Sequence, residues 1–113
     1  MKAPLVPSEE KTSLHQFVAV SEIFVPDAGR SALEEAFAHR LGAVDHWPGF
    51  RDLEVWADKA DPCRLVMVSW WDSQECFASY MRSEEHGRSH ERIPTGEHRP
   101  RPRGFRRYTI VAR

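Results

Sequence analysis

The stretch RLVMVSWWDSQECFASYMRSEEHGRSHER, residues 64–92, decides the fold of this chain. Residues 64–71 alternate between two sets of side chains that are both largely apolar, which predicts a strand covered on both faces. Asp72, with Glu75 three positions later, has capping-box spacing, so we expect a helix directly after the strand. Its apolar stripe comprises Phe77, Tyr80 and Met81. A further helical turn is expected to begin at Ser83 and to continue to the end of the stretch.

Two more elements are expected before the aromatic turn at residues 46–50. Residues 14–25 are rich in β-branched and aromatic side chains and predict a strand, which the segment 26–29 ends. Ser31 and Glu34 form another capping box and predict a helix that ends near Gly42. The apolar stripe of this helix is expected to comprise Leu33, Phe37, Leu41 and Val44.

The remaining segments complete the order of elements. After an aromatic turn at residues 46–50, a second strand is predicted by side chains that alternate between apolar and more polar positions, with Leu53, Val55 and Ala57 on one face and Glu54, Trp56 and Asp58 on the other. Residues 105–112 predict a last strand, which follows a Pro-Arg segment at 98–104. The order strand, helix, strand, strand, helix, strand predicts an α+β fold, the ferredoxin-like βαββαβ sandwich, over residues 14–113. Residues 1–13 are expected to be a flexible leader.

Composition excludes several classes of function. The 113 residues include 16 basic and 17 acidic side chains, so no long-range field attracts nucleic acid or an anionic membrane. No apolar run approaches the ~20 residues of a membrane span, and residues 1–13 lack the apolar core of a secretory signal. We therefore expect a cytoplasmic protein that binds neither membrane nor nucleic acid. Cys63 and Cys76 match no zinc spacing and are expected to be free, partly buried thiols.

The predicted strand at residues 64–71 also indicates an oligomer. Helices can cover one face of the sheet, but the other face carries Val66, Val68 and Trp70 and needs its own cover. In a chain of this length a second copy is the simplest cover. A homodimer is therefore expected.

The sequence also resembles the antibiotic-biosynthesis-monooxygenase superfamily, and within it most closely the heme-degrading monooxygenases. The resemblance extends over about residues 16–112, and its segments are VSEIFVP (20–26), LEEAFAHRLGAVDHWPGFRDLEVW (33–56), VSWWDSQECF (68–77) and the helical Ser83–His90. It implies a homodimer whose two sheets close into a dimeric α/β-barrel, with an active site between the helices and the sheet of each subunit. It also implies an Asn on the first strand, a Trp that ends the third, and a heme-ligating His on the following helix.

Placed on this chain, the resemblance implies that Trp71 and His90 are site residues. The Asn position is occupied by Ser21, whose hydroxyl is shorter than an amide and offers a single donor. The resemblance thus implies that Ser21, Trp71 and His90 are catalytic and that His90 ligates the heme iron.

The function implied by the resemblance is that of an enzyme that binds heme and opens the porphyrin with O2. An external electron donor would be needed, because the chain has no flavin or nicotinamide motif. A flat apolar ligand requires apolar walls, for which the candidates are Leu33, Phe37, Met67, Trp71, Phe77 and Met81. Two alternatives stay open. One is a cofactor-independent monooxygenase that acts on a small aromatic, polyketide-like substrate. The other is a dimer that binds heme or a small ligand without turnover.

Each candidate residue also has an ordinary structural explanation. Trp71 shares a strand face with Leu65 and Met67 and could be core, and Ser21 could bond only to backbone. His86 precedes His90 by four residues, so the two imidazoles could form a weak divalent-metal pair. The arginine-rich end of the chain is expected to lie on a solvated loop and strand face, or to place one guanidinium against a ligand carboxylate; its members are Arg99, Arg101, Arg103, Arg106 and Arg107.

Overall fold

The structure, a computed structural model, describes residues 16–38, 44–84, 86–87 and 96–113. One antiparallel sheet has the strand order β2-β3-β1-β4, and two helices of at least eight residues belong to the described part of the chain. The elements are β1 (Phe17–Phe24), α2 (Asp27–Ala38), the 3-10 turn η1 (Val44–His46), β2 (Phe50–Ala57), β3 (Arg64–Trp71), α3 (Gln74–Met81), the 3-10 turn η2 (Gly96–His98) and β4 (Arg101–Thr109). This order confirms the predicted ferredoxin-like α+β fold.

Three strands of the sheet, β1, β2 and β3, follow the predicted patterns. β3 has the predicted bounds, and β1 lies within the predicted strand of residues 14–25. β2 pairs with β3 so that Leu53, Val55 and Ala57 share one face, as the alternation in the sequence indicated. The alternation predicts β2 and β3 because successive side chains of a strand point to opposite faces of the sheet.

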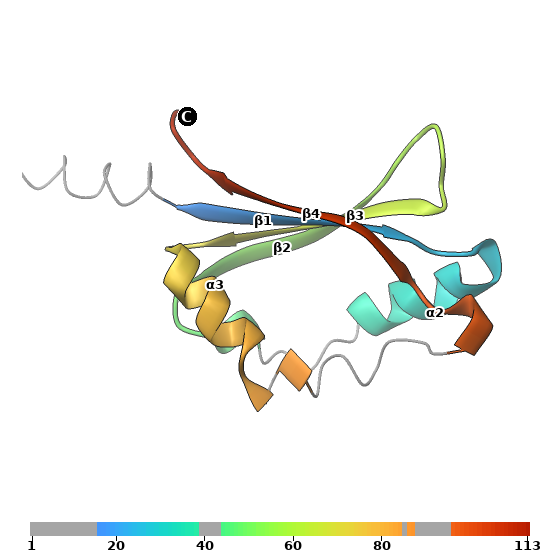
Figure 1. The fold of residues 1–113 in the computed structure, drawn as a ribbon, viewed down its shortest axis with the longest axis horizontal. Helices are drawn as coiled ribbons and strands as arrows, with labels where there is room; N and C mark the ends of the chain where they lie inside the picture. The colour runs from blue at the N-terminus through green and yellow to red at the C-terminus, as the bar shows by residue number, and fades with distance from the viewer. Residues whose placement is uncertain (1–15, 39–43, 85, 88–95) are drawn as a thin grey trace, which may run out of the picture.

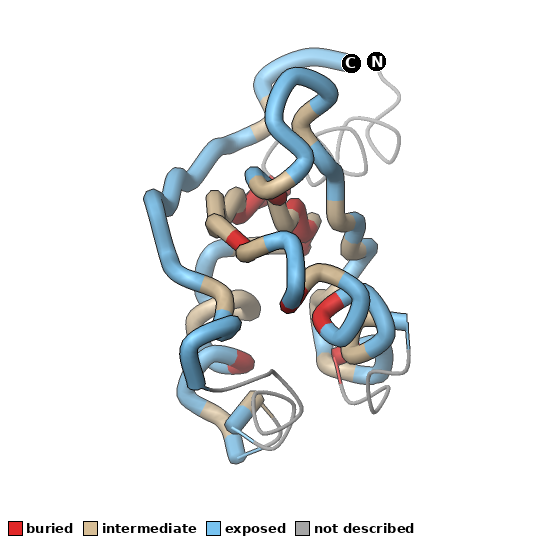
Figure 2. The backbone as a smooth tube through the Cα atoms, turned by 90° about the vertical axis from the view of Figure 1, so that its right-hand side faces the viewer, coloured by how far each residue is buried: buried red, intermediate tan, exposed pale blue. Residues whose placement is uncertain are grey.

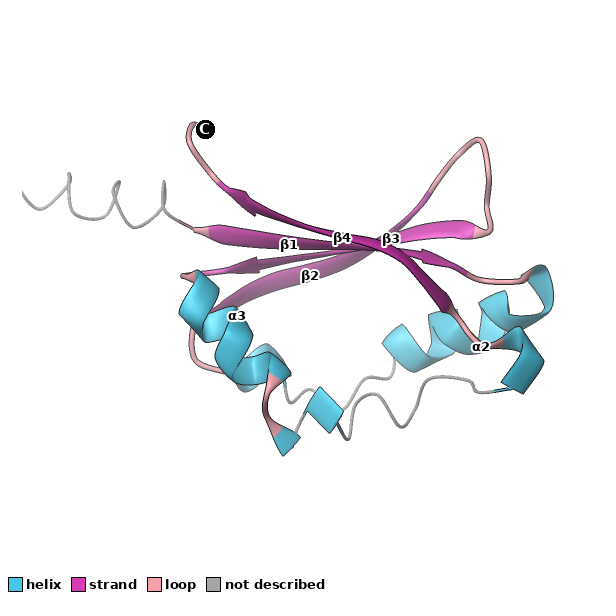
Figure 3. Ribbon diagram, viewed as in Figure 1, coloured by secondary structure: helices cyan, strands magenta, loops and turns pink. Residues whose placement is uncertain are grey.

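Both helices lie on the same side of the sheet (Figures 1 and 3). Two separate clusters of buried side chains join helices and sheet. Under α3, the core contains Phe17, Ala19, Val44, Trp71 and Tyr80, and under α2 it contains Val25, Leu33 and Leu65. The tube in Figure 2 shows buried positions in the strands and helices, whereas every residue of β4 is exposed.

The start of α2 differs from the prediction. The helix begins at Asp27, one residue after Pro26, rather than at Ser31. The N–H of Gly29 already donates to the carbonyl of Pro26 at 2.8 Å, so the first turn closes before the capping-box pair is reached. A Cβ on Gly29 would lie 2.3 Å from the carbonyl oxygen of His98, so only glycine allows this turn to pack against η2.

The predicted stripe of this first helix is only partly confirmed. Leu33 is 1% exposed and Phe37 packs against the same core cluster. Val44, however, belongs to η1 and packs under α3, so it is not part of the helix. Leu41 and the predicted end near Gly42 lie outside the described residues.

The cap of α3 also differs from the prediction by one residue. Ser73, not Asp72, caps the helix, because its hydroxyl accepts a hydrogen bond from the N–H of Cys76 at 3.2 Å. The carboxylate of Asp72 instead pairs with the guanidinium of Arg51 at 2.5 Å. Gly49 has φ +85° and approaches Cys76 so closely that a Cβ would lie 2.3 Å from its sulfur. The aromatic turn at residues 46–50 therefore packs closely against the first turn of α3.

Both cysteines are free and partly buried, as predicted. After α3, Ser83 accepts a hydrogen bond from the N–H of His86 at 3.1 Å, and the helical turn that was predicted to begin at Ser83 is present at residues 84, 86 and 87. The rest of that turn lies outside the described residues, as do the predicted leader 1–13 and the first two residues of the predicted strand 14–25.

The last strand starts earlier than the predicted Phe105. β4 begins at Arg101 and includes Pro102, which an edge strand tolerates because its outer N–H groups pair with no other strand of the sheet. Glu22 pairs with Gly104, and the next residue of β1 pairs with Pro102, so Arg103 forms a bulge. The guanidinium of Arg103 lies 5.2 Å from the ring centre of Phe24. The strand ends at Thr109 rather than at residue 112.

The sheet face opposite the helices carries large apolar side chains. Trp56 and Tyr108 are each 49% exposed, and the rings of Trp56 and Trp70 lie 6.5 Å apart on this face. Figure 1 shows no helix of the described chain on this side. We call this the open face; its apolar members are Val18, Val20, Trp56, Val66, Val68, Trp70 and Tyr108. Val18 and Val68 are already buried in the single chain, whereas the other five keep exposed surface. No helix in the part of the chain that the structure describes is long and apolar enough to cross a membrane.

Candidate ligand cleft

One row of side chains crosses the helix-facing side of the sheet between the two core clusters. Strand pairing places Val55 opposite Met67, Met67 opposite Ser21, and Ser21 opposite Phe105. Opposed residues of antiparallel strands point to the same face, so the four side chains form one continuous row. We call it the middle row. None of its members is buried, and Phe105 is 47% exposed. The middle row is therefore the partly open floor between the parts of the sheet that α2 and α3 cover.

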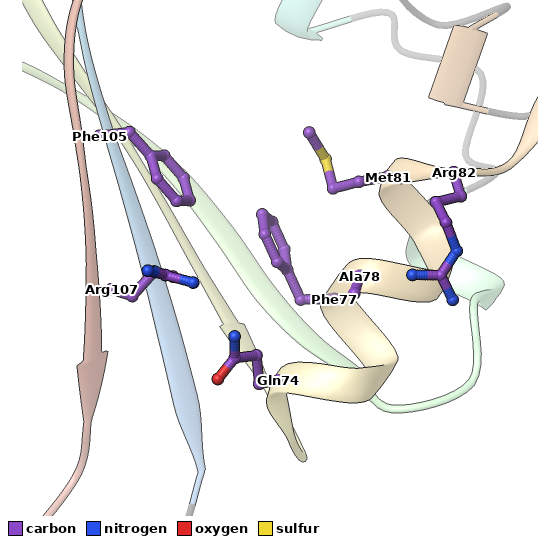
Figure 4. Close-up of a pocket in the computed structure, with 7 residues that line it drawn as sticks. All are labelled: Gln74, Phe77, Ala78, Met81, Arg82, Phe105 and Arg107. Carbon is purple, nitrogen blue, oxygen red and sulfur yellow. The ribbon is translucent and has the colours of Figure 1, made fainter.

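A cavity of about 410 Å³ adjoins one end of the middle row, between α3 and β4. Figure 4 shows the rings of Phe77 and Phe105 facing one another across it. The two rings are nearly parallel, with 5.9 Å between centroids and an interplanar angle of 15°. The residues that line the cavity are Gln74, Phe77, Ala78, Met81, Arg82, Phe105 and Arg107. Its wall is thus aromatic and apolar, with two cationic side chains.

Trp71 lies in the core rather than on the wall of this cavity. It is 1% exposed, and its ring centroid lies between 5.3 and 5.7 Å from those of Phe50, Phe77 and Tyr80. Its indole N–H donates to the hydroxyl of Ser69 at 2.9 Å. The single polar group of Trp71 therefore has an internal partner, and the side chain reaches the cavity only through Phe77.

Of the two candidate histidines, His86 and His90, the structure describes only His86. His90 lies outside the described residues. The imidazole of His86 is edge-on to the ring of Tyr80, with 5.3 Å between centroids. Among the residues described, no three His, Cys, Asp or Glu side chains gather into a metal-binding group. The proposed His86–His90 metal pair is not tested, because one of its members lies outside this part of the chain.

The structure therefore brings together only part of the predicted site. Ser21 and Met67 are neighbours in the middle row, and Phe77 reaches the row through Phe105. Phe37 packs beside the other core cluster, near Val55. Met81 lines the cavity and is 43% exposed, whereas Leu33 is buried core.

Five of the seven cavity residues were not predicted as ligand-wall residues; they are Gln74, Ala78, Arg82, Phe105 and Arg107. From the sequence, Phe105 is predicted to start a strand, and Arg107 is one of five arginines predicted to lie in solvent or to place one guanidinium against a ligand carboxylate. Phe105 and Arg107 nevertheless share a recognisable pattern. Their spacing of two residues is the signal that could have identified them, because residues i and i+2 of a strand share a face. Which side of the sheet these two side chains occupy could not be predicted, because it depends on how β4 pairs with β1.

Comparison with known proteins agrees with this fold. The chain belongs to the antibiotic biosynthesis monooxygenase family, whose model matches residues 16–92, more than half of its length. The sequence is 33% identical to a staphylobilin-producing heme oxygenase of Staphylococcus saprophyticus, in a match that covers 55% of this chain and 68% of that protein. It is also 33% identical to a mycobilin-producing heme oxygenase of Mycobacterium tuberculosis, over 56% of this chain and 60% of that one. The chain thus spans only about two thirds of each relative.

Solved structures show the same fold. A heme-degrading protein of Mycobacterium tuberculosis, with two hemes bound in its active site, has a TM-score of 0.70 and 24% identity, covering 86% of this chain and 97% of that one. The cofactor-independent oxygenase SnoaB of Streptomyces nogalater has a TM-score of 0.70 and 14% identity, covering 88% and 94%. These likenesses establish the shared fold. They include one protein that degrades heme and one oxygenase that needs no cofactor.

Proposed function

We propose that this chain is a heme-degrading monooxygenase, which binds heme and opens its macrocycle with O2 and external electrons. The observation that carries the proposal is the 33% identity to two heme oxygenases, over matches that cover 55% and 56% of this chain. The middle row also suits a large flat ligand. Its four strands are separated by three spacings of about 4.8 Å, so the row is about 14 Å wide.

The proposed roles of the residues follow from their chemistry. His90 would donate a ring nitrogen to the iron, and Ser21 would lie beneath the ligand in the middle row. Met67, Phe77 and Phe37 would supply apolar contact, Trp71 would support the wall from the core, and the protein would contribute position and exclusion of water. Heme supplies the iron that activates O2, and an external donor supplies the electrons. The proposed role of the chain itself is to bind and orient the heme.

Titration of the purified chain with hemin tests this function. The expected result is a Soret band that saturates at a fixed ratio of heme to chain and decays when ascorbate and O2 are added. A band that saturates and then persists under reducing, aerobic conditions would support a binding protein without turnover. Failure to saturate would overturn the heme proposal.

A cofactor-independent oxidation of a small aromatic substrate is the second candidate. The observation that favours it is the cavity of about 410 Å³, which falls within the roughly 300–1,000 Å³ of small-molecule sites. Ser21 in place of the Asn implied by the resemblance also suits a substrate that lacks iron. Oxygen uptake in the presence of a phenolic or anthrone-like compound, with metal chelated, would distinguish this function from heme degradation.

The open face supports the further proposal that the chain is a homodimer in which two sheets pack together. Trp56 and Tyr108 are each half exposed in a single chain, and packing against a second sheet would remove their apolar surface from water at about 25 cal/mol per Å² before entropy is counted. At the rim, the guanidinium of Arg64 pairs with the carboxylate of Glu22 at 2.8 Å, and this hydrogen bond raises the pKa of Arg64. A charged rim around an apolar centre is typical of interfaces.

We predict that Val20→Glu converts the dimer into a monomer. Light scattering of the wild-type chain should give twice the 13.1 kDa of one chain, and the variant should give 13.1 kDa, because burying a carboxylate at the interface has a desolvation cost that pairing with Arg106 opposite offsets only in part. Met81→Glu, on the helix side, is the matched control and should leave the mass unchanged. Circular dichroism should show that both variants remain folded. A wild-type particle of 13.1 kDa at micromolar concentration would contradict the proposed dimer.

We also predict that Ser21→Asn accelerates heme degradation without weakening heme binding. The amide would place a hydrogen-bond donor at the middle row, where negative charge develops on oxygen. The rate of Soret decay should rise by roughly 10-fold, less than the roughly 100-fold effect of a full oxyanion-hole donor. Ser21→Ala is the control: if it slows decay, the serine hydroxyl already supplies this donor, directly or through a water. Slower decay in Ser21→Asn would contradict the alignment of Ser21 with the Asn position.

A further inference from the structure

The cavity between α3 and β4 has an unbalanced charge. Its lining residues include Arg82 and Arg107 and no acidic residue. Within the described ranges, neither guanidinium has a carboxylate within ion-pair distance. Among the other described arginines, Arg30 pairs with Glu34, Arg51 with Asp72 and Arg64 with Glu22, whereas Arg99, Arg101, Arg103, Arg106 and Arg113 also lack a carboxylate partner. What distinguishes Arg82 and Arg107 is that both line the cavity. The two cavity arginines are therefore available to an anion from outside the described chain.

The aromatic pair next to these arginines provides a surface for a flat ring. Phe77 and Phe105 are nearly parallel, and Phe105 is 47% exposed, so one side of the pair is accessible to a ligand. Arg107 follows Phe105 by two residues on the same strand face, which places the two Cα atoms about 7 Å apart. In Figure 4 the side chain of Arg107 points from β4 toward the cavity. A planar ligand on Phe105 would thus have a cation beside one edge.

We propose that Arg107, assisted by Arg82, selects planar aromatic ligands that carry a carboxylate. A guanidinium binds a carboxylate through two parallel N–H···O bonds, while the phenyl pair holds the ring to which the carboxylate is attached. This inference rests on the proposed function and deepens it: in heme, the propionate groups would be the recognised feature. Arg106 points to the open face, because Arg106 pairs with Val20 and Arg107 with Ala19 on β1. It therefore serves as a charge-matched control.

The test compares hemin with hemin dimethyl ester, whose propionates are esterified. The wild-type chain should bind hemin about tenfold more tightly than the ester, as a charge-assisted hydrogen bond on a partly exposed surface allows. Arg107→Gln should remove this preference by weakening hemin binding about tenfold while leaving ester binding unchanged. Arg106→Gln should keep the wild-type preference, and Arg82→Gln should reduce it less than Arg107→Gln. Affinities come from Soret titrations at one ionic strength.

The outcomes separate this inference from the proposed function. Equal wild-type affinities for acid and ester, or an unchanged preference in Arg107→Gln, would overturn the role of Arg107 even if hemin binds tightly. If neither porphyrin binds, the heme proposal fails, and the same comparison is made by fluorescence with pyrenecarboxylate and its methyl ester. A preference for that acid which Arg107→Gln removes would support the inference for a smaller substrate, and no preference would overturn it.

Discussion

Replacement of His90 with alanine should abolish the Soret complex between this chain and hemin. His90 is the proposed axial ligand, and its loss would leave the porphyrin held only by apolar contacts and any carboxylate pairing. We expect affinity to fall by at least the roughly 10–100-fold that accompanies loss of a group supporting a metal ligand. Spectrophotometric titration measures both the band position and the affinity. Circular dichroism of the free variant checks that the fold is intact.

His86→Ala is the matched control for this experiment. The imidazole of His86 contacts the ring of Tyr80, so its removal should slightly affect packing and leave the heme spectrum nearly unchanged. Thirteen positions separate Phe77 from His90, as the resemblance requires, and His86 falls one helical turn short. If His86→Ala abolishes the band and His90→Ala does not, the ligand is His86. If both variants keep the wild-type spectrum, the heme proposal fails.

Replacement of Trp71 with alanine should produce the largest loss of stability in this domain. The indole is 1% exposed and lies between the rings of Phe50, Phe77 and Tyr80, so its removal leaves a cavity in the cluster beneath α3. The free energy of unfolding should fall by about 3–5 kcal/mol, as for other buried large aromatic residues. Urea unfolding at one fixed protein concentration measures it, because oligomerisation makes apparent stability depend on concentration.

Two milder variants separate packing from hydrogen bonding at this position. Ser69→Ala leaves the indole N–H of Trp71 without its acceptor and should cost about 1–3 kcal/mol. Trp71→Phe removes donor and bulk together and should cost less than Trp71→Ala. A Trp71→Ala chain that is as stable as wild type but no longer binds hemin would show instead that the indole acts at the ligand, as the resemblance implies.

The parts of the fold that could be predicted are those determined by local pattern. β3 and β2 alternate regularly because each packs one face on helices or on neighbouring side chains over its full length. The helix boundaries were less predictable, because several residues compete for each cap. Pro26–Asp27 starts α2 before the Ser31 signal, and Ser73 takes the cap for which Asp72 was also suited. Pro102 in β4 indicates a loop unless the strand is known to lie at an edge.

The candidate site could be predicted only where its residues share one strand or helix. The alternation of its strand places Met67 on the face opposite Val66, Val68 and Trp70, whereas Ser21 is a candidate through the resemblance. That the two are paired with each other and with Phe105 depends on long-range register, including the bulge at Arg103, which no local pattern contains. The burial of Trp71 likewise depends on Phe50 and Tyr80, which come from other elements.

The irregular edge of β4 also determines how chains can meet at high concentration. The exposed N–H and C=O groups of an edge strand can form hydrogen bonds with strands of other molecules. Repeated addition of strands in this way extends the sheet and can begin a fibril. Pro102 lacks an N–H, the bulge at Arg103 interrupts the regular spacing, and Arg101 adds charge along the same few residues. These features oppose edge-to-edge growth at β4. They leave the apolar face of the sheet, which accepts a limited number of partners, as the favoured route of association.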